Sequence, residues 1–188
     1  MELKIKIPED ISDITLEQFV AYEMLRDSKE LDSFVEKSIN IFTGLDLSLM
    51  GDIPVKEKES IFLQCMTALD VSPEFTNRFT IDGVEFGFVP NIDTMNGDEY
   101  TDAVRYSDSK DNMHRLMAVL FRPIKKDGKF GNYSIVKYTG TSEYAELMKR
   151  TPMNIVNGCL GFFLTLLHDL KNHSQTYMSQ EQVKEKSH

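Results

Sequence analysis

The segment from Arg78 to Pro123 decides the fold, and it begins Arg78-Phe79-Thr80-Ile81-Asp82-Gly83-Val84-Glu85-Phe86-Gly87-Phe88-Val89-Pro90. Apolar and polar residues alternate on both sides of Asp82-Gly83, a pattern typical of half-buried strands. Asp-Gly is a favoured two-residue turn because both central positions accept positive φ. We therefore predict a β-hairpin whose apolar face lies on helices.

The end of this segment, Asn112 to Pro123, predicts an amphipathic helix. Proline lacks a backbone N–H and fixes φ, so Pro123 is expected to stop the helix. The connection before it, residues 91–111, holds six acidic and two basic residues and is expected to include a short helix near residues 98–106. One apolar stripe of the predicted amphipathic helix carries Met113, Leu116, Met117, Leu120 and Phe121.

Apolar residues at helical spacing predict further helices over residues 15–28, 30–43, 55–69 and 143–150. Thr15 and Gln18 are expected to form a capping box at the start of the first of these. Gly44 is well placed to end the second. Residues 1–7 and 133–138 have the composition and alternation of strands.

A long helix is predicted from Pro152, with Thr151 as its N-cap. It is apolar nearly all round, so we expect it at the centre of the domain. Gly158 and Gly161 each weaken a helix by ~1 kcal/mol relative to alanine. Their presence predicts the close approach of another helix.

Together these elements predict an α+β fold, mainly helical, with about six helices packed around a small antiparallel β-sheet that contains the hairpin. A chain of 188 residues suits one domain, and residues 1–171 are expected to form it. Residues 172–188 are polar and are expected to be a frayed tail.

Charge and cysteine content narrow the class of protein. The net charge of −9 disfavours a nucleic-acid partner, since phosphate binding needs clustered lysine and arginine. Cys65 and Cys159 lie in apolar helical patterns and are interpreted as core residues in a reducing compartment, with a disulfide between the two helices as the alternative. Residues 1–20 show no signal peptide, and the apolar run from Cys159 to Leu167 is far shorter than the ~20 residues of a membrane span. We expect a protein of the cytosol.

No motif indicates catalysis or metal binding. His168 and His173 are five residues apart, whereas ligands on one helix face are three or four apart. Residues 93–99 lack the ligand spacing of a calcium loop, so a capped turn is the preferred interpretation. His114 has no nucleophile motif beside it. The glycines form no phosphate-binding pattern, and the lysines of residues 125–129 are interpreted as a solvated basic turn. We predict no catalytic, cofactor-binding or metal-binding residues.

The methionines allow two interpretations, because methionine fills cores and also suits surfaces that accept varied helices. In the second interpretation a partner's apolar helix binds a groove on the predicted amphipathic helix, and acidic residues steer a basic partner. The candidate partner-binding residues are Met113, Met117 and Phe121 for the groove and Asp98, Glu99 and Asp102 for steering.

The order of segments resembles a group of small tailed-bacteriophage proteins, and by gene type these look like tail assembly chaperones. Such chaperones are small, acidic, mainly helical proteins that keep the tape-measure protein soluble and help tail subunits polymerise on it. The resemblance covers most of residues 1–170. It is carried by Leu3-Lys4-Ile5-Lys6-Ile7-Pro8, Ile14-Thr15-Leu16-Glu17-Gln18-Phe19, Ile41-Phe42-Thr43-Gly44-Leu45, Arg78 to Pro90, Met113 to Pro123, Gly140-Thr141-Ser142-Glu143-Tyr144 and Phe162-Phe163.

The resemblance implies a non-enzymatic virion assembly protein in the host cell cytoplasm, but it assigns no functional residues. Its partners would be the tape-measure protein or tail subunits, with a homo-oligomer as a further option. The alternative is a structural component retained in the mature virion, such as a head–tail or tail accessory protein. An enzyme or host-takeover factor would require a pocket with convergent polar groups.

Overall fold

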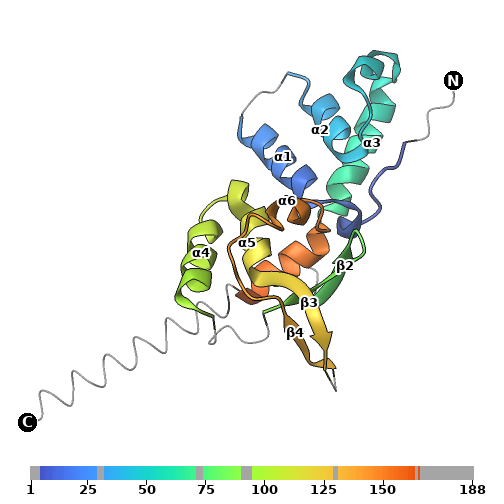
Figure 1. Ribbon diagram of the computed structural model, residues 1–188. Coiled ribbons are helices and arrows are strands. Elements are labelled where there is room, and N and C mark those ends of the chain that lie inside the picture. Colours follow the sequence, from blue (N-terminus) through green and yellow to red (C-terminus); the bar gives the residue numbers. More distant parts are fainter. Residues whose placement is uncertain are drawn as a thin grey trace, which may run out of the picture.

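The computed structural model describes residues 5–28, 32–70, 74–89, 95–128, 131–163 and 165 (Figure 1). It is mainly helical, with one small antiparallel sheet, so the predicted α+β class is confirmed. The α-helices are α1 (Leu16–Asp27), α2 (Phe34–Thr43), α3 (Val55–Ala68), α4 (Gly97–Ser107), α5 (Met113–Leu120), α6 (Ala145–Met148) and a last helix over residues 153–163. Short 3-10 helices are η1 (Ile11–Asp13), η2 (Leu47–Asp52) and η4 (Lys110–Asn112).

The sheet has the order β1-β2-β3-β4, and all of its pairings are antiparallel. Its strands are β1 (Arg78–Ile81), β2 (Val84–Phe88), β3 (Phe121–Asp127) and β4 (Tyr133–Ile135). The predicted hairpin is confirmed: Ile81 pairs with Val84, and the turn residues Asp82 and Gly83 have φ of 51° and 76°.

The junction between α5 and β3 corrects the prediction that Pro123 stops a helix. The helix ends at Leu120, and Phe121 is already extended, with φ −122° and ψ 129°. The Phe121 ring lies edge-on to Phe79 and Phe88 of the hairpin, at centroid distances of 4.8 and 5.3 Å. Pro123 is therefore a strand residue, opposite Phe86, and the lysines at 125 and 126 lie in β3 rather than in a turn.

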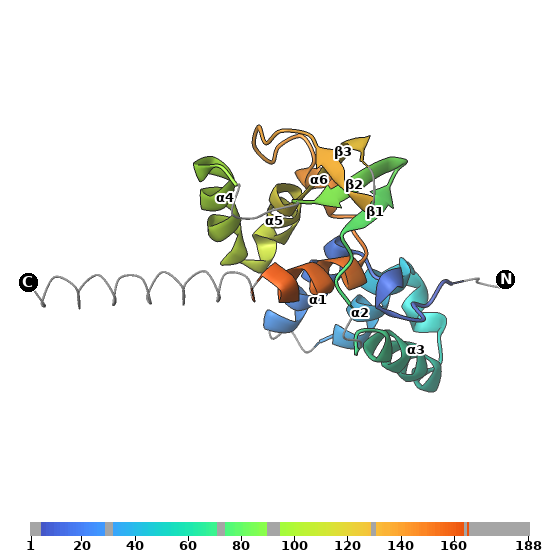
Figure 2. The ribbon, with the colours of Figure 1, turned by 90° about the horizontal axis from the view of Figure 1, so that it is seen from below.

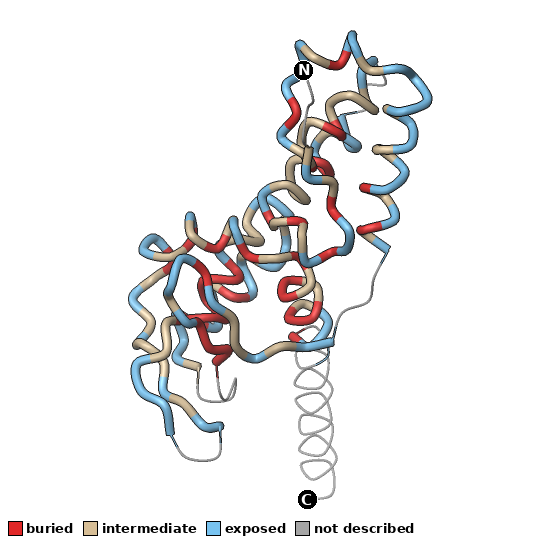
Figure 3. Tube along the Cα trace, turned by 90° about the vertical axis from the view of Figure 1, so that its right-hand side faces the viewer, coloured by how far each residue is buried: buried red, intermediate tan, exposed pale blue. Residues whose placement is uncertain are grey.

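The helix over residues 153–163 lies at the centre, as predicted. Figure 2 shows it running between α1–α3 on one side and the sheet on the other. Its Val156 and Cys159 side chains are fully buried in the main core, which extends from Ile11 to Phe163. Figure 3 shows that buried residues are denser around the sheet and this helix than along α3, which buries only Cys65 and Ala68.

The two glycines of this helix have different surroundings. A Cβ on Gly158 would lie 2.6 Å from the carbonyl oxygen of Glu74, so the predicted close approach is confirmed there. The neighbour is the extended segment at Glu74 and Phe75 rather than another helix. A Cβ on Gly161 would meet no atom of the described residues within 4 Å, so the prediction is wrong for that glycine.

Several predicted boundaries shift. The capping box of Thr15 and Gln18 and the left-handed Gly44 at the end of α2 are confirmed. Residues 5–7 form no strand, and residues 1–4 lie outside the described chain, as does the predicted tail at 172–188. Pro152 does not occupy the first helical turn: it bridges to Thr15, and its carbonyl accepts from the N–H groups of Ile155 and Val156.

Candidate functional site

Among the described residues, the α5 methionine face is packed into the core and does not form the predicted open groove. Met117 and Phe121 are both 0% exposed and belong to the main core. Met113 is half-buried and packs against the same core. This face of α5 is covered by the chain's own sheet and helices, so the core-filling interpretation of these methionines is correct.

The predicted acidic steering surface is also mostly internal. Glu99 is buried and pairs with the guanidinium of Arg122 at 2.5 Å. Asp102 accepts a hydrogen bond from the Tyr138 hydroxyl at 2.5 Å. Of the three carboxylates, only that of Asp98 remains exposed. The other two therefore hold α4 in place and are not free to attract a partner.

This polar group joins α4 to β3 and to the chain after β4. The Arg122 guanidinium lies 5.7 Å from the centre of the Tyr138 ring. Burial and the Asp102 carboxylate raise the pKa of Tyr138 well above its usual range. These contacts are consistent with a structural clamp.

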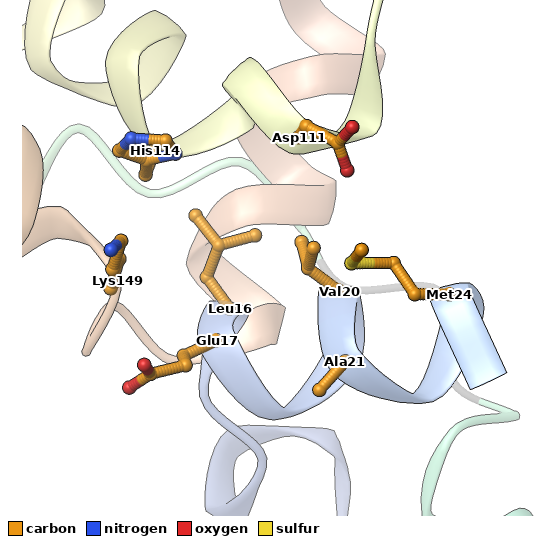
Figure 4. A pocket seen from close by; sticks show the side chains of 8 residues that line it. All are labelled: Leu16, Glu17, Val20, Ala21, Met24, Asp111, His114 and Lys149. Carbon is orange, nitrogen blue, oxygen red and sulfur yellow. The ribbon is translucent and has the colours of Figure 1, made fainter.

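An open surface lies elsewhere, in a cleft of about 360 Å³ between α1 and the segment that runs from η4 into α5. Figure 4 shows Leu16, Val20 and Met24 pointing from α1 toward the segment that carries Asp111 and His114. Its lining is completed by Glu17, Ala21 and Lys149. We call this space the α1–α5 cleft.

Helix α1 has two apolar faces, which explains the cleft. Tyr22 lies on one face, where its ring packs on Phe34 and Phe42 of α2 at centroid distances of 6.1 and 5.1 Å. Leu16, Val20 and Met24 follow one another at intervals of four and form the other face. This stripe is about 12 Å long, or roughly two helical turns. The spacing of four residues is a signal in the sequence, but no binding face was predicted from it.

Backbone hydrogen bonds fix the first end of the cleft. The N–H groups of Leu16 and Glu17 donate to the carbonyls of Thr151 and Lys149, each at 2.9 Å. The N–H of Met153 donates in return to the carbonyl of Ile14 at 2.8 Å. These three backbone hydrogen bonds therefore attach the start of α1 to the chain between α6 and the last helix.

An ion-pair network fixes the other end. Glu23 on α1 is 6% exposed and pairs with both Arg26 and Lys110. Lys110 also lies 3.6 Å from Asp27. Because Lys110 belongs to η4, this network holds η4 and α1 at a set separation. The two sides of the cleft, α1 and the segment from η4 into α5, are therefore held in place by the chain's own contacts.

The cleft combines an apolar floor with a charged rim. Leu16 is buried, Val20 and Ala21 are half-buried, and Met24 is 58% exposed. Burial and the nearby charges of Lys149 and Arg115 lower the pKa of His114, while Glu146 and the Asp111 backbone act in the opposite direction. Because its pKa is lowered, the His114 imidazole is neutral at pH 7. A neutral imidazole beside Val20 and Met24 makes this part of the cleft suited to apolar side chains.

The described residues were also compared with three other possibilities: a metal site, a disulfide and a membrane span. Within them, no group of three or more His, Cys, Asp or Glu side chains is placed to hold a metal ion. Cys65 and Cys159 are both free and buried, so the alternative of a disulfide between them is wrong. Among the described helices, none is long and apolar enough to cross a membrane. No family model matches the chain, and comparisons with curated proteins and with solved structures found no match.

Proposed function

We propose that this protein is a non-enzymatic bacteriophage tail assembly protein that binds an apolar helix of a structural partner in the α1–α5 cleft. The observation that carries the proposal is the cleft itself, in which Val20 and Met24 of α1 remain accessible between α1 and the segment from η4 into α5. The proposed partner is the tape-measure protein or a tail subunit, met in the host cell cytoplasm.

The dimensions of the cleft favour a helix as the occupant. Its α1 wall offers accessible apolar contacts at Val20, Ala21 and Met24, about one helical turn, which suits i and i+3 or i+4 anchors of a helix bound in a groove. Met24 is the most exposed apolar residue of the lining, and methionine adapts to varied apolar surfaces. Burying a partner's apolar side chains here at ~25 cal/mol per Å² would supply the affinity.

The phage setting rests on the resemblance in the order of segments. Several of the resembling segments have structural roles in this chain: Thr15 and Gln18 cap α1, Gly44 ends α2, and Arg78 to Phe88 forms the hairpin. A chaperone needs a stable scaffold and an accessible apolar surface, and the α1–α5 cleft offers such a surface.

Co-purification tests this function. The tagged chain is co-expressed with the tape-measure protein and tail subunits of the same phage genome, and captured proteins are identified by mass spectrometry. Wild type is expected to retain the partner, and Val20→Gln/Met24→Gln to lose it. The control Val55→Gln/Leu63→Gln removes two exposed apolar residues of α3, 67% and 62% exposed, and is expected to bind like wild type. Absence of co-purification with every tail protein would contradict the proposal.

Mass spectrometry of purified virions separates transient from permanent association. An assembly chaperone is expected to be absent from mature particles, although present in infected cells. Recovery of this chain in stoichiometric amounts from virions would instead identify a component retained in the particle, such as a head–tail or tail accessory protein.

A further inference from the structure

The rim of the α1–α5 cleft carries an excess of negative charge. Glu17 and Asp111 are exposed and line the cleft, and neither has an ion-pair partner in the described part of the chain. Figure 4 shows Glu17 at the end of the cleft near Lys149 and Asp111 at the end near Met24. Each end therefore presents one carboxylate whose charge is not matched within the described residues.

Three cations close to the cleft are engaged in ion pairs. Lys149 pairs with Glu146 at 2.7 Å, and this contact lowers the pKa of Glu146. Arg26 and Lys110 share Glu23 and Asp27 in a network whose charges sum to zero.

Two further groups near the cleft are Arg115 and His114. Arg115 does not line the cleft, and its guanidinium lies 5.8 Å from the centre of the Tyr106 ring. His114 lines the cleft as a neutral imidazole, since its pKa is lowered. Among the residues that line the cleft, Glu17 and Asp111 are thus the two carboxylates without an ion-pair partner in the described part of the chain.

We infer that the cleft selects a basic amphipathic helix, with apolar anchors on Val20 and Met24 and a lysine or arginine facing each of Glu17 and Asp111. This inference rests on the proposed function, because it names the charge of the helix that the cleft accepts. An apolar helix flanked by acids would place like charges together at both ends and would be rejected.

Three model helices supply the probes. Each is a fluorescent amphipathic peptide of the same length with the same leucine face, and its polar face is lysine, glutamine or glutamate. Fluorescence anisotropy at low salt measures their affinities. The lysine peptide is expected to bind most tightly, the glutamine peptide more weakly and the glutamate peptide weakest.

The decisive comparison removes the two rim carboxylates. Glu17→Gln/Asp111→Asn is expected to weaken the lysine peptide about fivefold or more, the loss expected for two exposed ion pairs, and to leave the glutamine peptide unchanged. The matched control Asp52→Asn/Glu59→Gln makes the same change in net charge at two exposed carboxylates that do not line the cleft. It is expected to retain lysine-peptide affinity.

Each contrary result has a distinct meaning. Equal losses in the rim and control variants would show attraction to net charge alone and would overturn the inference. Equal affinity for the three peptides, with binding still lost in Val20→Gln/Met24→Gln, would overturn charge selection but leave the apolar site of the proposed function standing. Lysine-peptide binding that Val20→Gln/Met24→Gln does not weaken, or no binding at all, would overturn both the inference and the assignment of the cleft.

Discussion

The carboxylate of Glu99 lies 2.5 Å from the guanidinium of Arg122, and both side chains are less than one-tenth exposed. The other Glu99 oxygen accepts from the N–H of Asn96 at 2.7 Å and completes the capping box of α4. One carboxylate therefore caps a helix and attaches it to the central strand β3. Such a pair is difficult to break, since each charge would be left buried without a counter-ion.

Substitution of one partner is expected to destabilise the fold strongly. Arg122→Met should lower the free energy of unfolding by about 3–5 kcal/mol, because Glu99 loses its buried counter-ion. Urea unfolding followed by circular dichroism measures this loss. The double variant Glu99→Leu/Arg122→Met removes both charges and should recover much of it. A loss below about 1 kcal/mol in Arg122→Met would contradict the role of the pair as a clamp.

Local chemistry explains which parts of the fold were predictable. The Asp82-Gly83 turn and the box of Thr15 and Gln18 depend on residues within a few positions of one another, and both were predicted correctly. The end of α5 was not, because Phe121 is extended by its packing against the hairpin rings, more than thirty residues earlier in the chain. Pro123, two residues further on, is typical of a helix stop, so the sequence pattern did not predict the strand β3.

In the candidate site, too, some features follow from neighbouring residues and others depend on contacts between distant parts of the chain. The stripe of Leu16, Val20 and Met24 is readable from its spacing, but nothing local says that it stays open. Openness depends on where η4 lies, and that is set by the contact of Lys110 with Glu23, eighty-seven residues apart. Residues 98, 99 and 102 likewise read from the sequence as one acidic surface that steers a partner, whereas in the fold Arg122 of β3 and Tyr138 engage two of them.

Substitutions of Met117 and Met24 are expected to have very different effects on stability, because the first is in the core and the second is exposed. Met117→Ala is expected to cost about 2–5 kcal/mol of unfolding free energy, since it opens a cavity in the main core. Met24→Ala should change stability by no more than about 0.5 kcal/mol, because Met24 is 58% exposed. Denaturant midpoints measure both. A mild effect at Met117 would reopen the interpretation of α5 as a binding face.

The two glycines of the last helix make a matched pair. Gly158→Ala is expected to destabilise the protein by about 1–3 kcal/mol, since its Cβ would meet the Glu74 carbonyl oxygen and the strain exceeds the gain in helix propensity. Gly161→Ala meets no described atom and should stabilise by up to about 1 kcal/mol. Thermal unfolding of both variants gives the comparison; a loss at Gly161 as large as that at Gly158 would contradict the difference in packing between the two positions.

Thiol reactivity should report on unfolding. Burial raises the pKa of Cys65 to about 11 and that of Cys159 further, so neither thiol ionises in the folded chain near neutral pH. Ellman's reagent is expected to label neither cysteine in native protein and both in guanidinium chloride. The exposed thiol of a Met24→Cys variant should react at once and serves as the control. Rapid labelling of a wild-type cysteine would indicate that its helix opens readily.

Acidification should weaken both the fold and the cleft through His114. Its pKa lies below the ordinary value near ~6.5, so the unfolded chain binds this proton more readily than the folded chain. Stability therefore falls as pH drops below that ordinary value, and the His114 part of the loss disappears in His114→Gln. Protonation would also place a new cation between the rim carboxylates Glu17 and Asp111 and repel a basic helix.

Two measurements check this expectation. Urea midpoints at about pH 7 and about pH 5.5 should differ less in His114→Gln than in wild type, since the remaining titratable groups are common to both proteins. Lysine-peptide affinity should fall over the same interval in wild type and by a smaller factor in the variant. Because the glutamine peptide carries no charge to repel, its affinity should change little. An unchanged pH dependence in His114→Gln would show that the imidazole at the cleft contributes to neither effect.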